Sequence, residues 1–138
     1  MVLTRKVALR SQGHTDIIDI TNQVAEEIRR SGLKAGIVTI FVPGATGGLT
    51  TIEYEPGLVH DLKQAFERIA PYDMEYRHHM RWGDDNGASH VRASLLGPSL
   101  TVPFAERELL LGTWQQVIFI DFDTRPRSRE LILQIIGE

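Results

Sequence analysis

The sequence contains no cysteine, and this absence removes several kinds of chemistry at once. Disulfides, thiolate zinc sites and a cysteine nucleophile are all excluded. No apolar run approaches the roughly 18–20 residues that a membrane-spanning helix needs. The first ten residues also lack the apolar stretch that follows the charges of a signal peptide. We therefore expect a cytoplasmic protein that does not interact with membranes.

The sequence also has no excess of positively charged residues. The 138 residues include 15 Lys and Arg against 18 Asp and Glu, giving a formal net charge of −3. This balance argues against nucleic acid or an anionic membrane as the main partner. The hydrophobic content of 42% and charged content of 24% are those of an ordinary globular chain. A single domain spanning residues 1–138 is expected.

Alternating and β-branched apolar residues predict about seven strands along the chain. The first alternation involves Leu3, Val7 and Leu9, and the other expected strands are residues 37–42, 49–54, 100–104, 109–111, 117–122 and 131–136. Three helices are predicted: one capped by Thr21 or Asn22 and ending at Gly32, one from Pro56 to Pro71, and a short one capped by Asn86. Residues 72–86 are expected to be mostly loop. Because the last strands are consecutive, the pattern favours the α+β class.

Residues 76–92 hold the densest group of ionisable side chains, including three of the five histidines and two adjacent aspartates. Imidazoles and carboxylates serve a divalent metal site, and they also serve acid–base chemistry at neutral pH. The spacing matches no standard motif such as HExxH. The alternative is a solvated loop in which Arg–Asp pairs order the surface, and the pattern leaves both interpretations open.

Single residues in and near this region carry their own alternatives. His79 is either exposed or functional. His90 lies at the start of a predicted helix, where it could bind an anion or be a hydrogen-bonded histidine. Glu53 and Asp121 each interrupt an apolar strand, so each faces either solvent or a cleft.

The glycine-rich segment 44–48 has backbone amides that could hold a phosphate. However, it joins two strands and fits neither GxGxxG nor the lysine-bearing phosphate loop, so a tight turn is favoured. There is also no GxSxG motif.

Three segments of the second half carry a family resemblance. Residues 89–100 read SHVRASLLGPSL, residues 111–116 read LGTWQQ, and the last five residues read QIIGE. In this order they resemble the YjbQ-like family, whose members are described as secondary thiamine-phosphate synthases. The resemblance covers essentially the whole chain. It implies a single compact α+β domain of mostly antiparallel strands in a two-layer β core with about three helices, assembled as a homotrimer with a polar cleft where subunits meet.

The resemblance also implies roles for particular residues. Its Tyr-x-His element matches Tyr76-Arg77-His78, and the catalytic set becomes His78, His90, Glu53 and Asp85. The substrate-binding set becomes Arg77, Arg92, Asn86, Thr46, Ser94, Trp114 and Gln115. Many family members have a His-Thr-Ser/Thr element where this chain has residues 42–46, so a third histidine is missing here.

The implied reaction couples a pyrimidine pyrophosphate to a thiazole phosphate. Loss of pyrophosphate requires Mg²⁺ and Arg or Lys to neutralise developing charge, whereas paired histidines suit Zn²⁺ better. Whether a metal binds, and whether it is Mg²⁺ or Zn²⁺, is left open. His78, His90 and Glu53 are the residues expected to hold it. Because the third histidine is missing, we expect little tightly retained zinc.

Two other functions stay open at this point: a non-catalytic protein that binds a phosphorylated metabolite or a metal, and a metal-dependent hydrolase. Two structural expectations follow from the resemblance to the synthase family. His90 and Glu53 should face one cleft, and the chain should form a trimer, in part because the apolar run 117–122 exceeds what one small domain covers.

Overall fold

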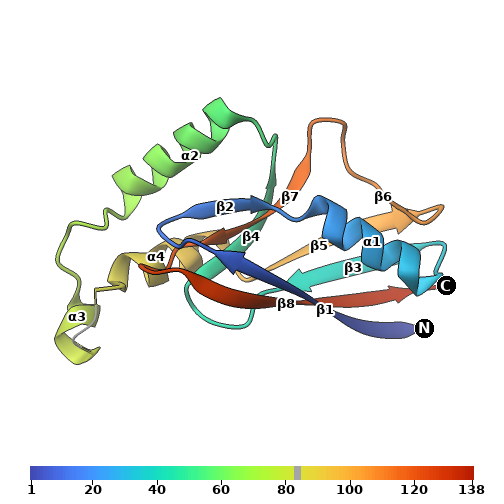
Figure 1. Ribbon diagram of the computed structural model, residues 1–138, viewed down its shortest axis with the longest axis horizontal. Coiled ribbons are helices and arrows are strands. Elements are labelled where there is room, and N and C mark those ends of the chain that lie inside the picture. The colour runs from blue at the N-terminus through green and yellow to red at the C-terminus, as the bar shows by residue number, and fades with distance from the viewer. Residues whose placement is uncertain (83–84) are drawn as a thin grey trace.

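The strands form two antiparallel sheets in the computed structural model, which describes residues 1–82 and 85–138, with backbone alone for residues 80–82 (Figure 1). The larger sheet has the order β1-β8-β3-β5-β6. Its strands are β1 (Val2–Ser11), β8 (Arg127–Gly137), β3 (Gly36–Phe41), β5 (Ser99–Ala105) and β6 (Glu108–Leu109). The smaller sheet has the order β2-β7-β4, from β2 (Asp16–Asp19), β7 (Gln116–Asp121) and β4 (Gly47–Ile52).

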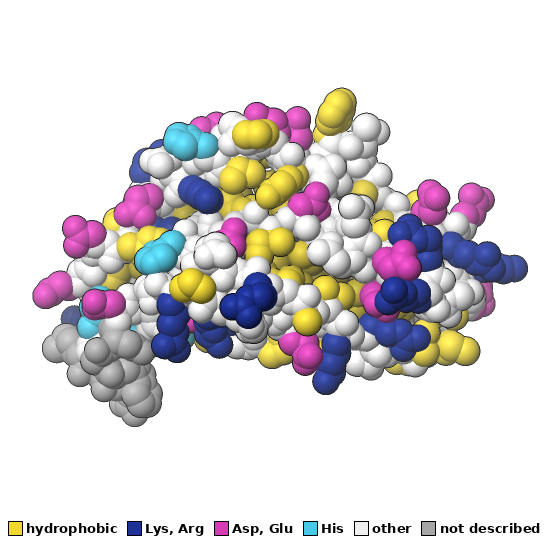
Figure 2. Space-filling model, viewed as in Figure 1, with side chains coloured by type: hydrophobic (Ala, Val, Ile, Leu, Met, Phe, Trp, Pro, Cys, Tyr) yellow, Lys and Arg dark blue, Asp and Glu magenta, His cyan; other side chains and the backbone are white. Residues whose placement is uncertain are grey.

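The main core lies between the two sheets. Alternate residues of β3 and β8, such as Val38 and Leu133, are fully buried against Phe119 of β7. Helix α1 (Thr21–Ser31) closes this core with Val24 and Ile28. Its outer face is charged: Figure 2 shows Lys and Arg side chains gathered over α1, as expected for a solvated helix face.

A second core lies on the opposite face of the smaller sheet. Here α2 (Pro56–Ile69) and α4 (Gly87–Leu96) lie on this side of the sheet (Figure 1). Phe66 of α2 and Ala93 of α4 form one buried cluster with Ile118 and Ile120 of β7. The predicted α+β domain with two antiparallel β layers is therefore confirmed, with helices as a third layer. The run Val117–Phe122 is buried within the single chain, so the argument that it needs a second subunit was wrong.

Three elements differ from the sequence prediction. Residues expected to be loop contain α3 (Arg77–Trp82), which raises the number of helices in the described residues to four. The short strand β2 was not predicted. The expected strand 109–111 is only the two-residue β6, because the chain leaves the sheet after Leu109.

The predicted caps of α1 are also wrong. Ile20 occupies the N-cap position, and Thr21 is the first residue inside the helix. The first amide of the helix is bonded by Asp19 instead. Its Oδ1 accepts hydrogen bonds from the Thr21 amide at 2.9 Å and the Thr21 hydroxyl at 2.6 Å. The predicted end at Gly32 is confirmed, with a left-handed φ of 73°. None of the helices in the described residues is long and apolar enough to cross a membrane.

Candidate functional site

Helices α3 and α4 meet at a pair of histidines. The ring centroids of His78 and His90 are 4.5 Å apart, with their planes inclined by 35°. The residue just before α3 approaches α4 closely at Gly87, where a Cβ atom would lie 2.6 Å from the Cβ of Tyr76. The absence of a side chain at Gly87 therefore leaves room for Tyr76, from which α3 continues. The structure thus brings together the two histidines that the family resemblance singled out.

A third histidine of the same segment is paired with a carboxylate. His79 Nδ1 lies 3.6 Å from Asp85 Oδ1, and the His79 side chain is partly buried while Asp85 is exposed. The ring of Tyr76 meets His79 edge-on at 5.9 Å. The alternative in which His79 is simply exposed does not hold. Asp85, one of the predicted catalytic residues, lies beside it.

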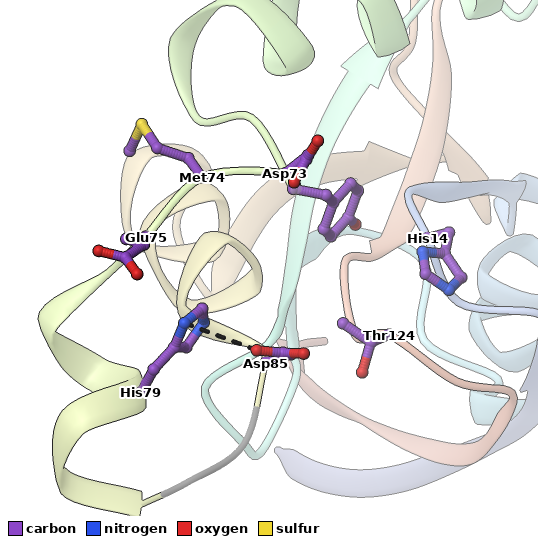
Figure 3. Close-up of a pocket in the computed structure, with 8 residues that line it drawn as sticks. His14, Asp73, Met74, Glu75, His79, Asp85 and Thr124 are labelled. Atoms are coloured by element: carbon purple, nitrogen blue, oxygen red, sulfur yellow. Dashed lines mark ion pairs between the residues drawn. The ribbon is translucent and has the colours of Figure 1, made fainter.

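An open cleft of about 750 Å³ begins at this pair. Figure 3 shows His79 and Asp85 on one side, with His14 across the cleft from them. The described residues that line it are His14, Tyr72, Asp73, Met74, Glu75, His79, Asp85 and Thr124. Its volume lies in the range typical of small-molecule sites.

The start of α4 is held by the smaller sheet and not by a side-chain cap. Asn86 occupies the predicted N-cap position, but its side chain makes no capping hydrogen bond and instead donates one to Asp123. The Ser89 hydroxyl donates to the Phe122 carbonyl. Burial alone would raise the pKa of Asp123, but hydrogen bonds from Arg127, the Thr124 amide and Asn86 hold it below its usual value. The first turn of α4 is therefore fixed against β7.

Arg92, predicted to bind substrate, is buried with 1% of its side chain exposed. Its guanidinium donates to the Ala70 carbonyl at 2.9 Å, Thr15 Oγ1 at 2.8 Å and Glu67 Oε2 at 2.6 Å. It also lies 3.9 Å from the centroid of the Tyr72 ring. These contacts tie α4 to α2 and to the cleft wall. Arg77, in contrast, is exposed.

Thr46 and Asp121 belong to a second buried network. Arg129 donates to both oxygens of Asp121 at 2.8 Å and to Thr46 Oγ1 at 2.7 Å. Of the two alternatives for Asp121, exposed strand face or cleft, neither holds, because its side chain is fully buried. Thr46, predicted to bind substrate, lies in this interior network.

The remaining predicted residues lie elsewhere. Glu53 is exposed just after β4, and the neighbouring turn 112–115 is fixed by Gln115, which accepts from the Gly112 amide at 3.0 Å and donates to Thr51 at 3.0 Å. Trp114, on this turn, is 74% exposed. Ser94 is exposed on α4, where its hydroxyl donates to the His90 carbonyl at 2.8 Å.

Glu53 and His90 lie toward opposite ends of β7. Ile52, next to Glu53, pairs with Gln116 at the start of β7, whereas Ser89, next to His90, bonds to Phe122 just beyond its end. Six residues of strand at about 3.3 Å each separate the two ends by roughly 20 Å. One chain therefore does not bring Glu53 and His90 into one cleft.

The distance between Glu53 and His90 also argues against a shared metal site within one chain. The residues expected to hold one, His78, His90 and Glu53, do not converge within the chain. In the part of the chain that the structure describes, no group of three His, Asp or Glu side chains is close enough to hold a metal ion. The described residues of a single chain therefore do not provide the three or four protein ligands that a Zn²⁺ site takes.

His14 and Tyr72 line the cleft but were not among the residues predicted for the site. Neither residue stands in a recognisable motif, and His14 is a single histidine between the first two strands. Gly13, directly before His14, is typical of a turn, and a turn alone does not indicate a ligand-binding side chain.

The fold and the site define a class of protein: a small α+β protein of two antiparallel sheets, with a cleft lined by His14 and by His79 of α3. The chain belongs to the YjbQ-like family, since the family model described as UPF0047 protein YjbQ-like matches residues 5–138.

Relatives and solved structures agree with this membership. A UPF0047 protein of Archaeoglobus fulgidus is 38% identical over 136 residues, which covers 99% of this chain and all of the relative. A YjbQ-like protein of unknown function from Sulfolobus solfataricus superposes with a TM-score of 0.94 at 29% identity, covering 100% of this chain and 99% of the other. A family member from Clostridium acetobutylicum gives 0.87 at 30% identity, covering 96% and 99%.

Proposed function

We propose that this protein joins two phosphorylated small molecules, as a secondary thiamine-phosphate synthase does, at a site built around His78 and His90. The observation that carries the proposal is the contact of these two rings at the start of α4. The amide groups and dipole of a helix start favour phosphate, and imidazoles can donate hydrogen bonds to it. Exposed Arg77, next to His78, supplies a cation for the same group.

The chemistry of this step is a substitution at carbon. The ring nitrogen of the thiazole phosphate attacks the methylene carbon of the pyrimidine pyrophosphate, and a C–N bond forms. The C–O bond to pyrophosphate breaks, and pyrophosphate leaves with the electron pair. The negative charge that develops on the leaving oxygen is stabilised by Arg77 and by donors fixed around the histidine pair.

We further propose that the site is completed in a homotrimer. Val91 and Leu95 are exposed on α4 beside His90, and Leu95 is 61% exposed. At the other end of β7, Leu110 and Trp114 are exposed on the connection that leads into this strand. Contact between these two unlike apolar surfaces on neighbouring copies is head-to-tail, and a head-to-tail contact forms a ring when the rotation closes after a whole number of copies, three in this proposal. This arrangement would bring Glu53 of one subunit to His90 of the next.

The assembly has a direct test. We expect light scattering to give a trimer for the wild type and a smaller species for Leu95→Glu, because a carboxylate would be buried in the apolar contact. Far-UV circular dichroism should remain unchanged, since Leu95 is exposed in the single chain. The matched control is Phe41→Glu, which places the same charge on the outer face of the larger sheet and should leave the trimer intact. A wild-type monomer at micromolar concentration would contradict the proposal.

The activity is tested by incubating the protein with the pyrimidine pyrophosphate, the thiazole phosphate and Mg²⁺ and measuring thiamine phosphate. We expect slow product formation by the wild type. His90→Asn should reduce the rate about tenfold to a hundredfold, the effect of losing a hydrogen bond to a charged group. His60→Asn, at an exposed position of α2, is the control and should have no effect. Binding of both substrates without product would identify a binding protein instead.

A further inference from the structure

The segment between β1 and β2 has an unusual backbone. Gly13, His14 and Thr15 have φ angles of 76°, 51° and 64°, so three successive residues are left-handed. Residues with a Cβ atom disfavour this region, and those that adopt it normally occur singly. A Cβ atom at Gly13 would lie 2.5 Å from the Arg125 carbonyl oxygen, so that position requires glycine. Such strained segments persist only where their surroundings hold them, and they concentrate at functional sites.

Hydrogen bonds on both sides hold the segment. The His14 amide donates to the Asp123 carbonyl at 2.6 Å. Thr15 Oγ1 accepts from Arg92 at 2.8 Å and lies 3.0 Å from the Tyr72 hydroxyl. The Tyr72 hydroxyl donates its own proton to the Phe122 carbonyl at 2.7 Å, so Thr15 is the donor in their contact. The polar groups of Thr15 are thus used inside the protein.

The imidazole of His14 is used differently. It is exposed, meets the Tyr72 ring edge-on at 5.3 Å and lines the cleft. Figure 3 shows it across the cleft from His79 and Asp85, with Thr124 between. Buried hydrogen bonds therefore hold the backbone of this segment in place. The His14 imidazole that it carries faces the cleft and does not pack in the core.

The rest of the lining indicates the charge of the ligand. Asp73, Glu75 and Asp85 place three carboxylates on the cleft, and its described lining includes no Lys or Arg. Charge complementarity therefore favours a cation. The described residues offer a bare metal ion no group of three close ligands, and the cleft, at about 750 Å³, has the size of a small-molecule site. Tyr72 and Met74 add the apolar surface that an organic ligand requires.

We propose that His14 is a ligand-binding residue and that the cleft between His14 and the His79–Asp85 pair holds a cationic organic group, a protonated or alkylated nitrogen heterocycle. This inference deepens the proposed function and rests on it for one point: the cationic ring and the phosphate near His90 belong to ligands of the same site. His14 accepts a hydrogen bond from the ring substituent or packs against the ring, and the carboxylates neutralise its charge.

The probe for a test is 4-aminopyridine, which is a heteroaromatic cation at neutral pH. We expect saturable binding to the wild type at low salt, followed by the histidine and tyrosine ring signals in NMR spectra. His14→Asn should weaken binding at least tenfold. Asparagine tolerates left-handed backbone, so this variant should fold like the wild type, with an unchanged melting temperature. His60→Asn is the matched control and should bind within twofold of the wild type.

Asp85→Asn provides a second arm, because it removes one charge from an exposed position without disturbing the core. It should weaken binding severalfold. Equal affinity of the wild type and His14→Asn would overturn the inference. So would saturable binding of inorganic phosphate in the cleft without binding of the cation. The measurement involves no turnover, so a protein that binds the cation through His14 but forms no product would refute only the proposed function.

Discussion

Replacement of Arg129 by methionine is expected to lower the free energy of unfolding by about 3–5 kcal/mol. Arg129 and Asp121 are 5% and 0% exposed, and two hydrogen bonds of 2.8 Å join them. The variant leaves the Asp121 carboxylate buried without its main partner, and an unpaired buried charge is far more costly than the loss of a surface ion pair. Urea unfolding followed by far-UV circular dichroism measures the difference.

Two control variants make this prediction specific. Lys6→Met removes the cation of the exposed Lys6–Glu130 pair, 3.6 Å apart, and should change stability by less than about 1 kcal/mol. Adding Asp121→Asn to Arg129→Met should recover part of the loss, because the remaining polar group is uncharged. A cost below about 1 kcal/mol for Arg129→Met would show that the buried pair contributes little.

The same pair makes stability depend on pH. Burial would raise the pKa of Asp121, but hydrogen bonds from Arg129, Ser11 and the Asp123 amide outweigh this and lower it. A group whose pKa is lowered by folding stabilises the protein above its unfolded-state pKa, which is about 3.9. That contribution is lost as the pH falls from there through the folded-state pKa. Asp121→Asn should therefore lose less stability than the wild type as the pH falls below about 4.

Much of the fold could be predicted from residue periodicity. The alternation in β1 and the helical spacing of Val24 and Ile28 in α1 were sufficient, because each element buries one face against a large core. The elements that were missed are short. The four residues of β2 and the six of α3 carry too few periods to be distinguished from loop, and their stability comes from tertiary contacts.

The candidate site was less predictable because burial decides what each charged residue does. Arg92 and Arg77 look equivalent in the sequence, yet one is enclosed by three hydrogen-bond partners and the other is exposed. Likewise, no local pattern indicates that Asp121 pairs with Arg129 inside the protein. His14 was missed because its left-handed backbone depends on Asp123 and Arg125, which lie far along the chain.

The separation of Glu53 from His90 within one chain gives the sharpest test of the proposed trimer. We expect Glu53→Gln and His90→Asn proteins each to have little synthase activity alone. When the two are unfolded in urea and refolded together, activity should return, because a head-to-tail ring joins Glu53 of one subunit to His90 of the next. Every mixed ring contains one interface at which both residues are intact.

The fraction of activity that should return follows from the number of intact sites in the mixed rings. Random assembly of equal amounts makes about three quarters of the rings mixed, and each has one intact site in three, so about a quarter of the wild-type activity should return. The control is the double variant, Glu53→Gln with His90→Asn in one chain, refolded with either single variant, which restores no intact site. A mixture of the single variants that stays inactive, although the refolded wild type recovers fully, would show that Glu53 and His90 do not act together across the subunit contact.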